Sequence, residues 1–255
     1  MKKLLLKTHH LWSRLLPGFY YGYRVAGGRI YLDICESRAM LARALGRYER
    51  AKHRAIEALL RPAGTFIDVG VNKGDFALLA ARIVGDAGRV LAFEPEPDNC
   101  HWIERSIALN GYRNIQLHQL ALSDRNGEAE LYIGAQSGWH SLVVHSSGAD
   151  RQAVRVVTRT LDDFLAEQGW EGSVDMMKID VEGAEMEVLR GAAKVLESNP
   201  TIVLLVDIHP QQGVDPKQLC GYLERLGFTI FRERPPFDIP VRACEGVKSI
   251  IARRA

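Results

Sequence analysis

The sequence predicts an α/β protein in which helices cover both faces of a mainly parallel sheet. From residue 65 onward, short apolar runs alternate with amphipathic stretches, and this alternation is typical of strands connected by helices. The apolar runs are nearly continuous, as expected for strands that are buried on both faces. The last two predicted strands are joined through PPFDIPVRACEG, which leaves no room for a crossover helix. We therefore expect them to pair antiparallel at the end of the sheet.

The predicted elements follow one another in a regular order. Apolar runs predict strands at residues 65–70, 89–95, 174–180, 201–209, 229–233 and 247–254. Further apolar or alternating pieces lie at residues 115–122, 127–133 and 153–160. Amphipathic stretches predict helices at residues 74–84, 98–111 and 216–226, and two more that begin at Leu161 and after Glu182.

A Pro-Ala-Gly break divides the chain into two unequal parts. We predict that residues 1–62 form an N-terminal helical lid or extension, because residues 38–60 are Arg-rich and helical in pattern. Residues 63–255 are predicted to form the sheet domain, with a polar insertion at about 126–158. The extension is expected to pack on the sheet domain.

The first residues of the chain predict a short basic amphipathic helix. Its continuous apolar run, Leu4 to Leu6, is too short for a secretory signal or a membrane-spanning helix. Such a helix either packs on its own domain or contacts a membrane surface or a partner, and both interpretations stay open. The four cysteines are scattered and indicate neither a zinc site nor a disulfide framework. A cytoplasmic location is therefore the expectation.

Composition narrows the class of partner. The hydrophobic share of 47% and the charged share of 25% are ordinary for a globular protein. The formal net charge of +2 is close to balance, whereas nucleic-acid binding needs a concentrated stripe of Lys and Arg. We expect no nucleic-acid partner, and a small molecule or a glycan as substrate.

The segment FIDVGVNKGDF, around Asp68, predicts a ligand site at a strand-to-helix turn. Glycine is used where the backbone approaches a ligand or adopts a positive φ, and Gly70 and Gly74 flank this turn. The free amides of the following helix favour an anionic group such as a carboxylate. Glu94 ends the next strand, where its carboxylate can accept hydrogen bonds from the hydroxyls of a ribose. Together with Asn72 in the turn, these residues predict a nucleoside-containing cofactor.

The spacing of the glycines indicates which nucleoside. Dinucleotide sites usually carry G-x-G-x-x-G, whereas this chain has G-x-x-x-G. The carboxylate of Asp68 is an unfavourable neighbour for a pyrophosphate but suits the ammonium group of S-adenosylmethionine, directly or through water. The sequence therefore favours S-adenosylmethionine over NAD.

Six segments, in chain order, resemble the FkbM-type family of S-adenosylmethionine-dependent methyltransferases: FIDVGVNKGDF, LAFEPEPDN, LALSD, TLDDF, MMKIDVEGAEMEVLRGA and LLVDIHP. The resemblance covers about residues 64–210, and KIDVEGAE is its most specific part. It implies a Rossmann-like class I methyltransferase fold, with a seven-stranded sheet and one antiparallel C-terminal strand. It also implies mostly O-methylation of hydroxyls on sugars and secondary metabolites.

The resemblance carries cofactor contacts onto particular residues of this chain. They are Asp68, Gly70, Asn72, Gly74 and Glu94, with Ser123 and Asp124 near the adenine. The chain departs from the family pattern at Val71 and Asp207, where relatives carry Ala and Glu. The second departure falls at a candidate substrate position.

Polar residues end two apolar strands where the acceptor is expected, because ligands in such folds bind outside the carboxyl ends of the strands. Asp180 is the predicted contact to both cofactor and acceptor. His209, with an ordinary pKa of about 6.5, is predicted to take the proton of the acceptor hydroxyl. Glu182 is predicted to orient the acceptor or assist as a base, and Asp207 to contact it.

Each of these residues also has a structural interpretation. Asp180 would cap the next helix, Glu182 would offset its dipole, and His209 would pack in a turn. The same side chains, with Asp207, are ligand types that Mg or Mn accepts, so a divalent cation stays open as an alternative. No metal ligand is predicted.

The segment SGWHSL lies in the polar insertion, where a methyltransferase can cover its acceptor. Trp139 offers a flat surface to a sugar ring and His140 offers a hydrogen bond, with hairpin packing as the alternative. The leading hypothesis is O-methylation of a hydroxyl on a sugar, glycan or secondary metabolite. An N-methyltransferase for a small-molecule amine and a non-catalytic S-adenosylmethionine-binding module are the alternatives. A nicotinamide oxidoreductase is disfavoured by the glycine spacing.

Overall fold

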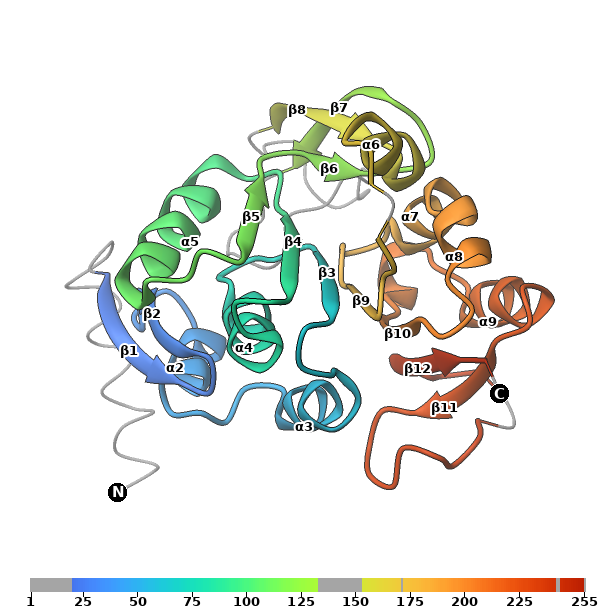
Figure 1. Cartoon of the computed structure of the whole chain (residues 1–255), viewed down its shortest axis with the longest axis horizontal. Coiled ribbons are helices and arrows are strands. Elements are labelled where there is room, and N and C mark those ends of the chain that lie inside the picture. Colours follow the sequence, from blue (N-terminus) through green and yellow to red (C-terminus); the bar gives the residue numbers. More distant parts are fainter. Residues whose placement is uncertain (1–19, 133–152, 171, 242–243, 255) are drawn as a thin grey trace.

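A seven-stranded sheet with the order β11-β12-β10-β9-β3-β4-β5 forms the centre of the molecule (Figure 1). The computed structural model describes residues 20–132, 153–170, 172–241 and 244–254. The strands of the sheet are β3 (Thr65–Val69), β4 (Arg89–Phe93), β5 (Ile115–His118), β9 (Met176–Ile179), β10 (Val203–Asp207), β11 (Thr229–Arg232) and β12 (Ser249–Arg253). Strand β12 pairs antiparallel with β10 and β11, and the other pairs are parallel. The fold class predicted from the sequence is confirmed, including the antiparallel pair at its end.

The direction of the strand order reverses at β3. Strands β4 and β5 follow on one side of β3, whereas β9, β10 and the final pair lie on the other side. A crevice opens at the carboxyl ends of the strands where the order of an α/β sheet reverses, and ligands bind in such crevices. The topology therefore places the candidate site beyond the ends of β3, β4 and β9.

Two hydrophobic cores lie on opposite faces of the sheet. Because side chains alternate along a strand, Ile67 and Met177 point into one core, whereas Phe66 and Met176 point into the other. The first core also takes residues from α6 (Leu161–Glu167), α7 (Glu185–Gly191), α8 (Ala193–Ser198) and α9 (Pro216–Arg225). The second takes residues from α2 (Arg38–Ala44), α3 (Arg50–Leu59), α4 (Asp75–Val84) and α5 (Pro97–Asn110).

A small sheet stands beside the main one and contains the described part of the predicted polar insertion. Its strands, in the order β6-β8-β7, are β6 (Ala121–Leu122), β7 (Gly127–Tyr132) and β8 (Ala153–Arg159). Strands β7 and β8 form an antiparallel hairpin. Residues 133–152, which include Trp139 and His140, lie outside the described residues.

The extension is not helical throughout, so the prediction for its first described part is wrong. An antiparallel hairpin of β1 (Tyr21–Val25) and β2 (Gly28–Leu32) precedes the helices. The pair Ala26-Gly27 forms its turn, and β-forming residues alternate on both sides of it. The side chain of Asn110 ties the hairpin to α5 through the backbone of Arg29. The predicted basic helix of the first 16 residues lies outside the described residues.

The helical part of the extension agrees with the prediction. Helices α2 and α3 occupy residues 38–44 and 50–59, and α3 lies against α4 at the lower edge of the view in Figure 1. Glu49, in the left-handed region with φ 39°, immediately precedes α3, and its side chain makes no capping hydrogen bond. This bend turns the first residues of α3 toward the carboxyl ends of the strands.

The cysteine interpretation needs a correction. Cys220, on α9, forms a disulfide with Cys244, which lies 24 residues further along the chain. Cys35 and Cys100 are free. Sequence spacing did not indicate the pair because its two members are brought together by the packing of α9 against the segment before β12. The scattered cysteines are therefore no argument for a reducing compartment.

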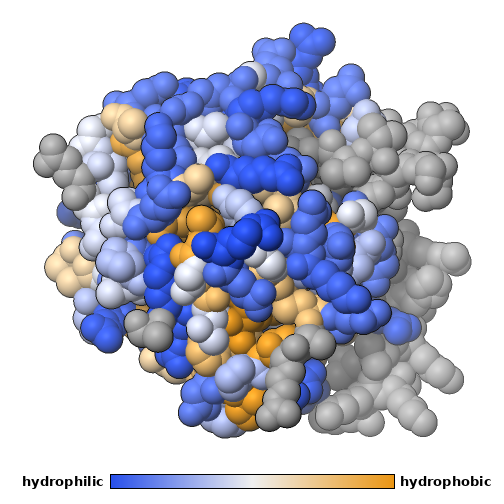
Figure 2. Space-filling model, turned by 90° about the vertical axis from the view of Figure 1, so that its right-hand side faces the viewer, coloured by the Kyte–Doolittle hydropathy of each residue, from blue (hydrophilic) through white to orange (hydrophobic). Residues whose placement is uncertain are grey.

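The described helices do not meet the requirements of a membrane-spanning helix. Within the described part of the chain, no helix is both long and apolar enough to cross a membrane. Figure 2 shows the side of the molecule that lies to the right in Figure 1. Hydrophilic residues cover most of this face, and hydrophobic residues gather in its lower part.

Candidate active site

A cleft of about 1060 Å³, including its open mouth, lies at the carboxyl ends of β3, β4 and β9. Its floor comes from the turns that follow these strands. One wall comes from the extension and the other from β6 and β7. The extension lines the cleft with Ser37, Arg43 and Tyr48, and the far wall contributes Leu120, Ala121, Leu122 and Leu131. The strand ends contribute Gly70 and Asn72 after β3, Glu94 after β4, and Lys178, Asp180 and Glu182 at β9.

The turn after β3 is built so that a ligand can approach its backbone. A methyl group on Gly70 would lie 1.9 Å from the carbonyl oxygen of Asp180, and the φ of Gly70 is 78°. No residue with a side chain fits there. Asn72 also has a positive φ, and its buried Oδ1 accepts no hydrogen bond from any described residue. Gly74 caps α4 with φ 94° and is absent from the cleft lining.

Glu94 stands at the end of β4 with 4% of its surface exposed. Its Oε2 accepts the N–H of Asn72 at 2.7 Å, and its Oε1 accepts the N–H of Glu96 at 3.1 Å and an amide hydrogen of Asn99 at 3.2 Å. Burial raises the pKa of Glu94 to about 7, although these hydrogen bonds oppose the rise. A carboxylate offers about four acceptor positions, so one remains for a hydroxyl in the cleft.

Asp68 lies beneath the cleft and reaches it through Lys178. The carboxylate is fully buried, and its Oδ1 lies 3.2 Å from the Nζ of Lys178 on the neighbouring strand. Lys178 Nζ also donates to the carbonyl oxygen of Gly70 at 3.1 Å. Burial raises the pKa of Asp68 to about 6 against the opposing charge of Lys178. Asp68 is not among the residues that line the cleft, and its ion pair holds Lys178 there. The predicted contact of Asp68 with a ligand, directly or through water, stays a prediction.

The far wall of the cleft is apolar. Leu120, Ala121, Leu122 and Leu131 line it. Ser123 and Asp124, predicted to lie near an adenine, follow this wall directly in the chain but are not among the lining residues. The side chains just before Ser123 line the cleft, and the predicted placement of Ser123 and Asp124 near an adenine stays a prediction.

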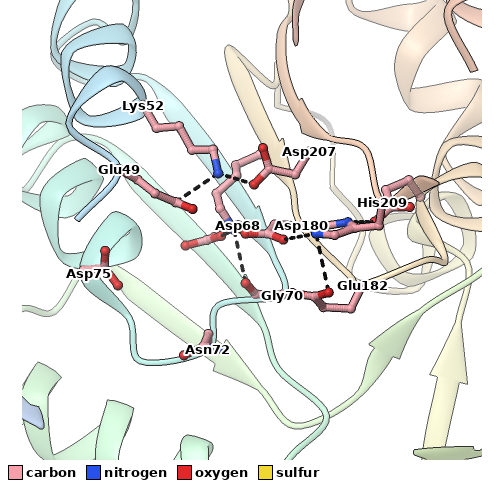
Figure 3. A network of polar contacts seen from close by, with 12 residues as sticks. Glu49, Lys52, Asp68, Gly70, Asn72, Asp75, Asp180, Glu182, Asp207 and His209 are labelled. Carbon is pink, nitrogen blue, oxygen red and sulfur yellow. Dashed lines mark hydrogen bonds and ion pairs between the residues drawn. The ribbon is translucent and has the colours of Figure 1, made fainter. Parts of the chain in front are cut away.

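A charged network joins the extension to the ends of β9 and β10 (Figure 3). Lys52, on α3, is buried and pairs with Asp207 and with Glu49 Oε2, the latter at 2.9 Å. Burial lowers the pKa of Lys52, but the surrounding carboxylates outweigh it and hold the pKa well above its ordinary value. Asp180 and Asp207 share this network. Burial raises the pKa of both, yet the nearby lysines keep Asp180 ionised, and the charge of Asp180 keeps the pKa of Asp207 high.

His209 is oriented by a buried carboxylate that the sequence analysis did not single out. Its Nδ1 lies 2.7 Å from Oε1 of Glu185, which is fully buried on α7 and also accepts the N–H of Gly183 at 3.1 Å. A carboxylate only accepts hydrogen bonds, so Nδ1 carries the proton. The opposite nitrogen, Nε2, lies 3.7 Å from Asp180 and 3.5 Å from Glu182.

The electrostatics of this group are set by its carboxylates. Burial lowers the pKa of His209, but the hydrogen bond to Glu185 and the charges of Glu182 and Asp180 outweigh it and raise the pKa to about 9. Burial raises the pKa of Glu182 to about 7 against the opposing charge of His209. Asp180 gives α7 no cap, because Ala184 precedes that helix without a side-chain hydrogen bond.

Sequence reasoning missed Lys52 and Glu185, as it missed Arg43, Tyr48 and Glu49 of the extension. Glu185 follows Glu182 by three residues within the motif KIDVEGAE, so the motif itself carried a signal for it. Lys52 carried none, because it is one basic residue among several in the helical pattern of the extension. Only the packing of α3 over the strand ends distinguishes it.

Two groups of side chains have the spacing of metal ligands. The ligand atoms of Asp180, Glu182 and His209 lie within 4.8 Å of one another, as do those of Glu49, Asp180 and Asp207. In the second group Lys52 already supplies the positive charge. In the first group, a cation would have to displace the proton of His209, whose pKa is raised to about 9, so its binding would weaken as the pH falls.

Comparison with known proteins identifies the family. The profile described as "Methyltransferase FkbM domain" matches residues 68–230. "Methyltransferase sdnD" of Sordaria araneosa is 33% identical over 204 residues, which cover 68% of this chain and 77% of that protein. "2-O-methyltransferase NoeI" of Sinorhizobium fredii is 29% identical over 160 residues, 56% of this chain and 64% of that protein.

"Hexuronic acid methyltransferase AglP" of Haloferax volcanii is 30% identical over 158 residues, which cover 61% of this chain and 59% of that protein. The matched segment of the family profile begins at Asp68 and includes the turn, Glu94, the end of β9 and His209. This agreement confirms the resemblance inferred from the sequence. The chain therefore belongs to the methyltransferases with an FkbM domain.

Proposed function

We propose that this methyltransferase uses S-adenosylmethionine to methylate a hydroxyl group on a sugar, a glycan or a sugar-bearing metabolite. The observation that carries the proposal is the pair of His209 and Glu185 at the end of the sheet. A buried carboxylate fixes the ring through Nδ1. His209 itself is not among the residues that line the cleft, but its Nε2 lies 3.7 Å from Asp180 and 3.5 Å from Glu182, which do line it. A base held in this way suits an acceptor that must lose a proton as it is methylated.

The names of two relatives support the acceptor class. NoeI is named a 2-O-methyltransferase and AglP a hexuronic acid methyltransferase. Each is matched over less than two thirds of its own length. Oxygen as the methylated atom and a sugar as its carrier are therefore proposals for this chain.

The residues of the cleft fit S-adenosylmethionine by their chemistry. Glu94 has one acceptor position left for a ribose hydroxyl. The apolar wall at Leu120 and Leu122 suits a flat base. The unpartnered Oδ1 of Asn72 and the glycine backbone at residue 70 suit the amino-acid end of the ligand. When bound, S-adenosylmethionine supplies a methyl group on a positively charged sulfur.

The chain's own residues have separate tasks in this proposal. Asp180 stays ionised beside both lysines and orients the acceptor by accepting a hydrogen bond. His209, once neutral, takes the acceptor proton at Nε2, and Glu185 stabilises the ring that has become positively charged. Correct placement of two reactants contributes about 7–11 kcal/mol, whereas a general base contributes about 10²–10⁴-fold in rate. The walls of the cleft therefore matter more than the base.

The extension is proposed to act as a lid and residues 63–255 as the catalytic domain. Arg43 and Tyr48 wall the cleft, and Lys52 neutralises the carboxylates at the strand ends. We propose no metal ion for the reaction, because Lys52 and Lys178 already provide the positive charge that a cation would bring. The predicted contacts of Trp139 and His140 with the acceptor, and a cytoplasmic location, remain predictions.

Calorimetry on the full chain tests the cofactor. S-adenosylmethionine and S-adenosylhomocysteine should bind and NAD should not. Glu94→Ala should weaken binding by tenfold or more, because a charged hydrogen bond contributes about 1.5–3 kcal/mol. Glu104→Ala, which removes an exposed glutamate of α5, is the matched control. Binding of NAD alone would refute the cofactor assignment.

A panel of neutral sugars, uronic acids and amino sugars then tests the acceptor, with mass spectrometry of the product. An O-methyl product supports the proposal, and an N-methyl product on the amino sugars would favour the alternative. Cofactor binding without any product across the panel would favour a non-catalytic binding module.

A further inference from the structure

A second cavity lies beside the cleft, between α3 and the bend that precedes it. It encloses about 610 Å³, again including its open mouth. Arg50, His53 and Arg54 of α3 line it. Arg43 and Tyr48 line both this cavity and the cleft, so the two spaces adjoin across these side chains. Nine of its ten lining residues precede the segment that matches the family, and the tenth is Asp75.

Basic side chains outnumber acidic ones in the lining of the cavity. Arg43 pairs with Asp75 at 2.9 Å and lies 3.6 Å over the ring of Tyr48. Glu57, the other acidic residue of the lining, pairs with Arg82 outside it at 3.5 Å. Within the ranges that the structure describes, neither Arg50 nor Arg54 forms an ion pair or a side-chain hydrogen bond, and both are exposed.

The spacing of the two free arginines makes an anion favourable between them. They stand four residues apart on α3 and therefore on the same side of the helix. Like charges at this spacing destabilise a helix, so a bound anion would also relieve their repulsion. Guanidinium groups bind the two oxygens of a carboxylate or phosphate in parallel.

We propose that this cavity binds an anionic group of the acceptor, a carboxylate or a phosphate, while the acceptor hydroxyl lies in the adjoining cleft. The proposal rests on the proposed function and narrows its substrate class to acidic sugars or sugar phosphates. Helix α3 then serves both spaces: Arg50 and Arg54 hold the acceptor, and Lys52, on another side of the helix, pairs with Asp207 at the strand ends.

Direct binding to the full chain tests this subsite without any need for methyl transfer. Glucuronate, glucose 1-phosphate and the neutral methyl glucoside are titrated separately by calorimetry in low salt, with S-adenosylhomocysteine present. At least one anionic probe should bind at least tenfold more tightly than the neutral sugar. The preferred probe distinguishes a carboxylate site from a phosphate site.

The matched variants separate this cavity from charge in general. Arg50→Gln/Arg54→Gln should weaken the anionic probe about tenfold or more and leave the affinity for S-adenosylhomocysteine unchanged. Arg113→Gln/Arg125→Gln removes two exposed arginines elsewhere and should change neither. Equal effects of the two double variants, or equal affinity for neutral and anionic sugars, would overturn the proposal. If the wild-type protein did not bind S-adenosylhomocysteine, that result would instead contradict the proposed function, whether or not the anionic sugars bind.

Discussion

Replacing Glu185 with Gln removes the buried charge behind His209 while keeping an oxygen that can accept the Nδ1 proton. In the wild type, Glu185 lies 2.7 Å from Nδ1, and Asp180 and Glu182 face Nε2 from 3.7 and 3.5 Å. Burial alone lowers the pKa of His209, and these three carboxylates raise it to about 9. The variant therefore isolates the part of the pKa that depends on the charge of Glu185.

The size of the change follows from the strength of the hydrogen bond. A hydrogen bond to a charged group contributes about 1.5–3 kcal/mol and a neutral one about 0.5–1.5 kcal/mol. Their difference, about 1–1.5 kcal/mol, corresponds to about one pKa unit. Because Glu185 is fully buried, its direct charge interaction adds to this difference. The pKa of His209 should fall from about 9 to roughly 7–8.

The sign of the pH dependence distinguishes a base from a structural histidine. A base acts in its neutral form, so the rate should rise with pH through the pKa of His209, and Glu185→Gln should move that rise to lower pH. The plateau rate at high pH should fall as well, because a weaker base removes the proton less effectively. The assay is kcat/KM from pH 6 to 10, together with NMR titration of the imidazole signals, which needs no acceptor.

Glu187→Gln on the same helix is the control and should leave the profile unchanged. Calorimetry with S-adenosylhomocysteine checks that Glu185→Gln still folds and binds. The reasoning is wrong if the NMR pKa of His209 falls while the kinetic profile stays in place, because the histidine is then not the base. It is also wrong if the pKa of His209 does not fall.

The remaining predictions concern the cofactor end of the cleft and the ion pair beneath it. Because an ionised carboxylate accepts a hydroxyl hydrogen more strongly than a protonated one, and the pKa of Glu94 is about 7, the Kd of S-adenosylhomocysteine should rise as pH falls from 8 to 6. Glu94→Gln should bind more weakly and lose this dependence, and a persisting dependence would contradict the assignment. Lys178→Met leaves the charge of Asp68 buried and unpaired, so the free energy of unfolding in urea should fall by about 3–5 kcal/mol. Asp68→Asn/Lys178→Met should recover part of this loss. If Lys178→Met destabilises the protein no more than the exposed control Lys194→Met, the ion pair is not the cause. Gly70→Ala should abolish cofactor binding, because the new methyl group would lie 1.9 Å from the Asp180 carbonyl oxygen. Gly111 has a similar φ of 68° but open space around it, so Gly111→Ala should lose only about 1–2 kcal/mol of stability. Equal effects of the two variants on cofactor binding and stability would exclude the steric explanation.

The sheet domain was readable from the sequence because its signals are local. The run from Thr65 to Val69 is apolar and short, and Gly70 marks the turn that follows it. The final antiparallel pair followed from the length of the segment that connects β11 and β12. A parallel pair needs a crossover helix, and this segment is too short to contain one. The hairpin of β1 and β2 was missed because its alternation lies in an extension that otherwise reads as helical.

Sequence reasoning predicted a site at these strand ends, but it did not predict every contact that the structure shows there. Asp180, Glu182, Asp207 and His209 do meet, because parallel strands in register bring their ends together. The ion pair between Asp68 and Lys178 was not predicted, because it depends on the register of the neighbouring strands β3 and β9. The pKa values were likewise out of reach, since burial and the placement of neighbouring charges set them.

The sequence by itself determined the fold class and the family, and it predicted a ligand turn after β3 and a glutamate on the ribose side. Each of these depends on residues close together in the chain or on a quoted motif. Only the tertiary structure decided that Lys52 joins the carboxylates, that Glu185 holds His209, and that Arg50 and Arg54 face a cavity beside the cleft. The physical reason is distance along the chain. Lys52 and Asp207 are 155 residues apart in the chain. A local sequence pattern therefore does not predict that these two buried charges meet when α3 packs over the sheet.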